Sequence, residues 1–105
     1  MKFTTSTALL TLATIAPLAS ASTCSHSQNR WTITASGVDD VPGKCGGLWD
    51  NLKRFGACAV SGPSCGGSSG NLAWAFTTGV GCNAGMVEST WWQATKNQFG
   101  SISCP

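Results

Sequence analysis

The sequence carries little charge. Asp, Glu, Lys and Arg together make up 10% of its 105 residues, and the formal net charge at pH 7 is +2. A much stronger excess of basic residues is typical of proteins that bind nucleic-acid phosphates and of cationic peptides that disrupt membranes. We therefore expect no nucleic-acid partner and no membrane-disrupting activity.

Groups that transfer protons are also scarce. The chain has one histidine, His26, one glutamate and no tyrosine, whereas small secreted ribonucleases usually combine a carboxylate with histidines. The adjacent Asp39 and Asp40 suit the start of a helix better than they suit a glycosidase, whose two acids flank the bond from opposite sides. The sequence thus predicts no catalytic residue and no cofactor.

One segment matches a catalytic motif in its residues but lacks the structural context that the motif requires. Residues 66–70 read G-G-S-S-G, which fits G-x-S-x-G. That motif acts where the serine lies on a strand-to-helix elbow and an Asp and a His follow it in the chain. Composition here predicts a loop between two strands, and no histidine follows Ser68. We interpret the segment as a turn.

Long apolar runs are missing as well. The longest, residues 8–16 (ALLTLATIA), is well short of the ~20 apolar residues that a membrane span needs. Lys2 precedes it and Ala19-Ser20-Ala21 follows it, which is the pattern of a cleavable signal peptide. We predict a signal peptide over residues 1–21 and one secreted domain over residues 22–105.

Cysteine, by contrast, is abundant for a chain of this length. A domain this small buries only about 60–65% of its unfolded surface, so its apolar core alone is marginal. An even number of cysteines in an exported chain predicts disulfides, each worth about 2–4 kcal/mol. No C-x-x-C pair occurs, so we expect no metal site. The six cysteines are Cys24, Cys45, Cys58, Cys65, Cys82 and Cys104.

Periodicity predicts four strands and two helices. Residues 30–36, 57–61, 72–77 and 101–104 read as strands, the first and third with clear alternation. One helix is expected from Asp39 and Pro42 to Gly56, and the other from Asn83 to Asn97. The order is β-α-β-β-α-β, which predicts an α+β two-layer sandwich with both helices on one face of an antiparallel sheet.

This topology selects one disulfide pattern. With the usual sheet order 4-1-3-2, the segment before the first strand meets the end of the fourth strand. The start of the first helix likewise meets the end of the second strand, and the start of the second strand meets the end of the third. Since bridged Cα atoms lie about 4.4–6.8 Å apart, the predicted pairs are Cys24–Cys104, Cys45–Cys65 and Cys58–Cys82.

Tryptophan is the other abundant residue, with five copies. Trp31, Trp74 and Trp91 lie on predicted inner faces, and we expect them in the core. Trp49 lies at the edge of the apolar face of the first predicted helix. Trp92 lies about 100° round the helix from Trp91, so it is either an exposed anchor for a partner or a side chain stacked on Lys96 or covered by the last strand. The candidate binding residues are Trp92, Trp49 and Lys96.

The open face of the predicted sheet offers a second candidate surface. Its outward side chains are all small, so we expect it to be solvated or to make a flat contact with another molecule or a second copy of the chain. These residues are Thr32, Thr34, Ser36, Ala59, Ser61, Ala73, Ala75, Thr77, Ser101 and Ser103.

The whole mature chain resembles known families in its organisation. A signal peptide of fungal type followed by a six-cysteine β-α-β-β-α-β body is similar to the small cysteine-rich fungal effectors that share the α/β-sandwich fold of the smut-virus killer toxins. Residues 52–60 (LKRFGACAV) and the terminal S-I-S-C also resemble the necrosis-inducing extracellular effector family. Such families imply action outside the cell by binding, without catalysis.

Three functions follow as hypotheses. The first is a secreted, non-enzymatic virulence effector that binds an extracellular protein or cell-surface component of a host, for example in the apoplast. The second is an antimicrobial, killer-toxin-like protein that acts on competing microbes. The third is a small secreted hydrolase or ribonuclease, which would depend on His26.

Overall fold

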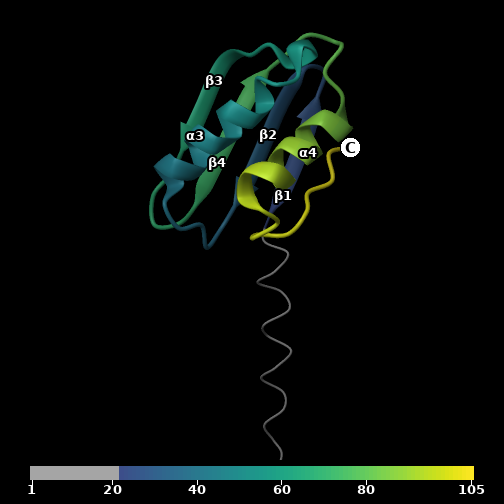
Figure 1. Ribbon diagram of the computed structural model, residues 1–105. Coiled ribbons are helices and arrows are strands. Elements are labelled where there is room, and N and C mark those ends of the chain that lie inside the picture. Colours follow the sequence, from purple (N-terminus) through teal and green to yellow (C-terminus); the bar gives the residue numbers. More distant parts are fainter. Residues whose placement is uncertain (1–21) are drawn as a thin grey trace, which may run out of the picture.

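The computed structural model describes residues 22–105 (Figure 1). The signal-peptide prediction for residues 1–21 lies outside this range. None of the helices within residues 22–105 has the length and hydropathy that a membrane-spanning helix requires. In chain order the elements are β1 (Thr23–Ser27), β2 (Arg30–Ala35), α3 (Val41–Leu52), the short 3-10 helix η2 (Gly56–Cys58), β3 (Ser61–Gly66), β4 (Leu72–Thr77) and α4 (Ala84–Thr95).

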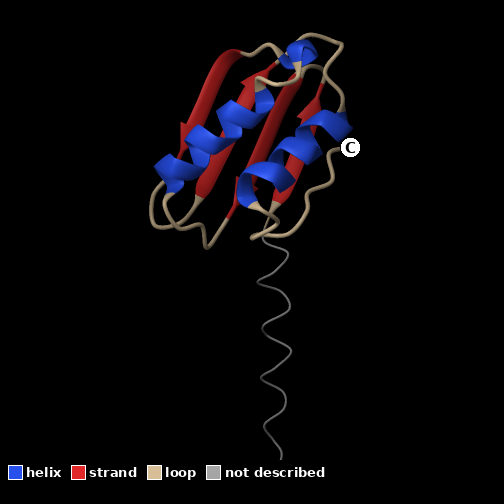
Figure 2. Ribbon diagram, in the orientation of Figure 1, coloured by secondary structure: helices blue, strands red, loops and turns tan. Residues whose placement is uncertain are grey.

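The four described strands form one antiparallel sheet in the order β1-β2-β4-β3. Both helices lie on the same face of this sheet, and no helix or strand of the described residues covers the other face (Figure 2). The fold class is therefore confirmed as a two-layer α+β domain with an antiparallel four-stranded sheet, two helices and three disulfides.

One edge strand differs from the prediction. The strand beside β2 is β1, at the start of the described chain, and residues 101–104 form no strand, so the element order is β-β-α-β-β-α. A turn of only two residues, Gln28 and Asn29, joins β1 to β2. Such a hairpin has a smaller loop-closure cost than a return from residue 101, and β1 escaped prediction because its sequence, TCSHS, lacks the large apolar residues of an ordinary strand.

The second predicted strand is also displaced. Residues 57–61 do not form it; they contain the end of η2, and β3 begins only at Ser61. β3 has little apolar character and contains Gly62 and Pro63. Proline is tolerated there because β3 is the other edge of the sheet, where the missing N–H breaks no ladder.

The disulfide prediction is confirmed for all three pairs. Cys24–Cys104, Cys45–Cys65 and Cys58–Cys82 have Cα–Cα distances of 5.0, 5.8 and 4.7 Å. The first pair survives the change of edge strand because Cys24 lies in β1 and the tail after α4 still runs back to it. The three bridges thus join β1 to the tail, α3 to β3, and η2 to the segment before α4.

The core fills the space between the helices and the sheet. The predicted core tryptophans Trp31, Trp74 and Trp91 are all fully buried. They pack with Leu48 of α3 and Val87 of α4 in one apolar cluster. This single cluster holds the two layers together.

Both helices begin as the sequence predicts. The Asp40 side chain accepts a hydrogen bond from the Gly43 N–H at 3.2 Å, and that of Asn83 accepts one from Met86 at 3.0 Å. Such caps satisfy N–H groups that have no partner within the helix. α3 is shorter than expected, because Leu52 is its last residue and Phe55 lies in the following turn.

The tail after α4 is anchored by side chains in place of a strand ladder. The Cys104 N–H donates to Glu88 Oε2 at 2.8 Å, and the Trp91 indole donates to the Gly100 carbonyl at 3.0 Å. Ile102 is buried against the core. The tail therefore runs along α4 and closes the side of the domain (Figure 1).

Removing the Glu88 carboxylate is expected to loosen this tail. A hydrogen bond to a charged group contributes more than one between neutral groups, so Glu88→Ala should lower the free energy of unfolding by about 1–2 kcal/mol in urea titrations. Glu88→Gln keeps an acceptor oxygen and should lose less. Equal losses in the two variants would contradict this role for the acceptor.

Candidate functional site

The His26 side chain packs against a buried tryptophan and the end of the tail. It lies in β1, where its imidazole stacks on Trp31 with ring centroids 3.6 Å apart and planes 5° from parallel. Its Nδ1 lies 3.2 Å from the Pro105 carbonyl oxygen. Among residues 22–105, no group of three or more His, Cys, Asp or Glu side chains is arranged to hold a metal ion. His26 therefore ties the tail to β1.

The two acids at the start of α3 have structural contacts as well. Asp40 is the cap described above, and Asp39 Oδ1 lies 3.5 Å from Lys44 Nζ and accepts from Gln98 Nε2 at 3.3 Å. The G-x-S-x-G match begins at Gly66, the last residue of β3, and its other residues lie between β3 and β4, as predicted. The Asn71 N–H donates to the Ser68 carbonyl at 3.0 Å. These residues form a turn between strands.

Trp92 is the largest exposed aromatic side chain in the described part of the chain, with 49% of its surface accessible. It lies on α4, directly after the buried Trp91. Lys96 does not continue α4 on the face that carries Trp92, because Lys96 is the C-cap of the helix and has a left-handed backbone (φ 54°). Among residues 22–105, no contact of the Lys96 ammonium with the Trp92 ring is found, and about half of the Trp92 surface is open.

Trp49 is half-buried and held rigidly by its neighbours. Its ring meets Trp74 at a centroid distance of 5.8 Å and Phe76 at 6.0 Å, with planes inclined by 72° and 74°. Edge-to-face contacts of this kind are favourable for aromatic rings. The part of the Trp49 ring that remains accessible is therefore a fixed apolar surface.

Trp49 and Trp92 lie on opposite flanks of the helical layer. The helices meet where Gly47 approaches Ala94, because a Cβ on Gly47 would lie 3.9 Å from the Ala94 Cβ. Two residues along a helix correspond to about 200°, so Trp49 points away from α4 and Trp92 points away from α3. The structure does not bring the two indoles into one site.

A cleft of about 350 Å³ opens beside Trp49. It lies between the C-terminal end of α3 and residues 55–60, and of the described residues that line it Lys53 alone is charged. Sequence reasoning missed this cleft because it placed residues 57–61 in a strand. The lining residues are Trp49, Leu52, Lys53, Phe55, Gly56, Cys58, Ala59 and Val60.

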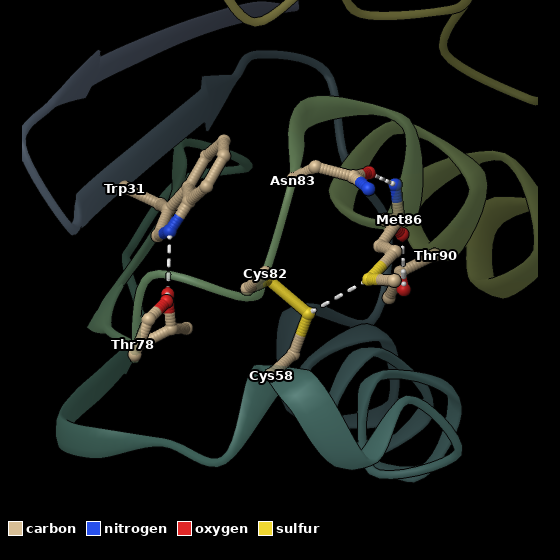
Figure 3. The surroundings of a disulfide bond; sticks show 8 residues. Trp31, Cys58, Thr78, Cys82, Asn83, Met86 and Thr90 are labelled. Atoms are coloured by element: carbon tan, nitrogen blue, oxygen red, sulfur yellow. Dashed lines mark hydrogen bonds between the residues drawn. A yellow bond between two sulfur atoms is a disulfide. The ribbon is translucent and has the colours of Figure 1, made fainter.

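The wall of this cleft is braced from behind. The Cys58–Cys82 disulfide joins η2 to the residue before the cap of α4, and the Cys58 sulfur lies 3.7 Å from the Met86 sulfur (Figure 3). Nearby, the Trp31 indole donates to Thr78 Oγ1 at 3.0 Å (Figure 3). The segment that lines the cleft is thus short and cross-linked.

Lys96 contributes to a different hollow. A shallow groove of about 520 Å³ runs between the start of α3 and the end of α4, and Lys96 lines it together with Gly43, Lys44 and Gln98. The three predicted binding residues therefore occupy three places: the outer flank of α4, the cleft at the end of α3, and this groove.

The open face of the sheet is rich in hydroxyl groups. One row across all four strands pairs Ser25 with Thr32, Thr32 with Ala75, and Ala75 with Ser64. Arg30 adds a charged group beside Thr77 of this sheet. Its Nη1 donates to Gly62 O at 2.9 Å and to Thr77 Oγ1 at 3.1 Å. The predicted positions Ser36, Ala59, Ser101 and Ser103 are not in the sheet. A dimer through this face stays a prediction.

Comparisons with protein-family models, with curated protein sequences and with solved structures gave no match to this chain.

Proposed function

We propose that this chain is a secreted, non-enzymatic binding module of effector type, which acts outside the cell on a protein or surface component of a host. The observation that carries the proposal is Trp92, an aromatic side chain left 49% exposed on a rigid helix. Exposing that much indole to water is unfavourable, and tryptophan is enriched among the residues that dominate protein interfaces.

The surroundings of Trp92 support this use. Its helix is pinned at one end by the Cys58–Cys82 bridge and along its side by the Glu88 contact to Cys104. A partner that docks there meets a surface that is already ordered, so binding loses little conformational entropy. The six cysteines all form disulfides, which persist in oxidising extracellular compartments.

The arrangement of the ionisable groups also supports binding over catalysis. His26 is stacked on Trp31, Asp40 caps α3 and Glu88 holds the Cys104 amide. Each of these groups has a structural contact that explains its position. A catalytic role for His26 would have to be compatible with that stacking.

Capture of a partner from host extracellular fluid by the oxidised mature domain tests the proposal. Trp92→Ala should reduce the captured amount at least ten-fold, since truncating a central interface tryptophan commonly costs 2 kcal/mol or more. Val80→Ala, at a position 88% exposed, is the matched control and should capture as much as the wild type. Equal capture by Trp92→Ala and the wild type, or loss with His26→Ala alone, would contradict the proposal.

A further inference from the structure

We propose that the cleft beside Trp49 binds a small apolar molecule that carries one anionic group, such as an aryl or alkyl carboxylate or sulfonate. This site is separate from the Trp92 surface and does not depend on the function proposed for it. Its volume of about 350 Å³ lies within the range of small-molecule sites, which are concave and mostly apolar with a few polar groups.

The apolar half of the ligand is specified by the cleft walls. Trp49, Phe55 and Val60 are each half-buried, so each presents part of its apolar surface to the opening. Leu52 and the Cys58–Cys82 bridge lie behind them and are buried. A ring or a short alkyl chain in this space would remove apolar surface from water on both sides, which favours binding.

The fixed orientation of Trp49 favours a planar group. Trp74 and Phe76 hold the Trp49 ring in two edge-to-face contacts. The ring therefore does not have to be ordered when a ligand stacks on it. A flat ligand gains the stacking contact without that entropic cost.

The charge of the ligand is specified by Lys53. Within residues 22–105 it is the one charged residue that lines the cleft. Its Nζ lies 3.3 Å from Oδ1 of Asp50, which is one turn earlier in the chain. Both side chains are 74% exposed, and an exposed pair of this kind contributes little to stability. An anionic group of a ligand at the rim of the cleft can therefore replace the Asp50 carboxylate as the partner of the Lys53 ammonium with little loss of stability.

Two fluorescent probes that share one ring system test the inference. 1-Anilinonaphthalene-8-sulfonate carries the apolar rings and an anion, and N-phenyl-1-naphthylamine carries the rings alone. Each is titrated into the oxidised mature domain at low salt, where charge contributes most. Wild type should bind both and should prefer the sulfonate. Lys53→Gln should weaken the sulfonate about two- to five-fold and leave the amine unchanged.

Variants of the cleft wall locate the binding. Val60→Trp fills the cleft and should abolish binding of both probes, and Ala59→Leu on the exposed wall serves as a second blocking variant. Trp92→Ala is the control that separates the two sites and should bind both probes as wild type does. Near-UV circular dichroism confirms that each variant is folded, because partly unfolded chains also bind the sulfonate.

Four results would overturn the inference. The first is equal affinity of wild type for the two probes, and the second is a Lys53→Gln variant that loses both. The third is binding that persists when both folded blocking variants are tested. The fourth is probe binding that falls as protein concentration rises, which would show that a second copy of the chain occupies the cleft.

Discussion

Replacing Cys24 and Cys104 together with serine is expected to lower the free energy of unfolding by about 4–5 kcal/mol. This bridge closes a loop of 80 residues, and the entropy that a disulfide removes from the unfolded chain grows with loop length. Domains of this size have only about 5–15 kcal/mol in total. The variant should therefore unfold at much lower urea concentration than the wild type, or fail to fold at 37 °C.

The other bridges are the internal comparison. Cys45–Cys65 and Cys58–Cys82 span 20 and 24 residues, for which the same relation gives about 3 kcal/mol each. Serine pairs at these positions should be less destabilised than the Cys24/Cys104 pair. The reverse ranking in urea titrations would show that loop closure does not govern stability here.

Gly67→Ala should cost about 2–4 kcal/mol. Gly67 follows β3 and has a φ of +142°, where side chains are rarely accommodated. A Cβ there would overlap the Asn71 carbonyl oxygen and lie 2.8 Å from the carbonyl carbon. Because both obstacles are backbone atoms, the β3–β4 turn itself would have to move.

The neighbouring glycine provides the matched control. A Cβ on Gly66 would meet nothing within 4 Å, and its φ is not positive. Gly66→Ala should therefore leave the thermal midpoint unchanged or raise it slightly, since alanine restricts the unfolded chain. If the two alanine variants melted at the same temperature, the close approach at Gly67 would not be a constraint.

Most of the fold follows from local patterns in the chain. The alternation in residues 30–36 and 72–77 predicts β2 and β4, and Asp40 and Asn83 predict the helix starts, because these signals are strong and local. The disulfide pairs followed because the spatial arrangement that joins them is the same whichever segment forms the outer strand. Local pattern failed at β1 and β3, the two edges, where few large apolar residues are required.

The candidate sites were predictable only in part. The helical position of Trp92 relative to Trp91 predicted that Trp92 leaves the core, because a one-residue step turns a side chain by about 100°, but it left open whether the side chain is exposed or covered. The cleft beside Trp49 depends on the path of residues 55–60, which turn through η2 and do not form a strand. Nor did spacing reveal that Lys96 adopts a left-handed backbone and faces a groove.

Thermal unfolding of the mature domain with and without reductant tests most directly the central claim, that three disulfides hold a small body rigid so that it presents binding surfaces. The oxidised form should show one cooperative transition, and the fully reduced form should show none above room temperature. A reduced form that keeps the melting temperature of the oxidised form would contradict the account.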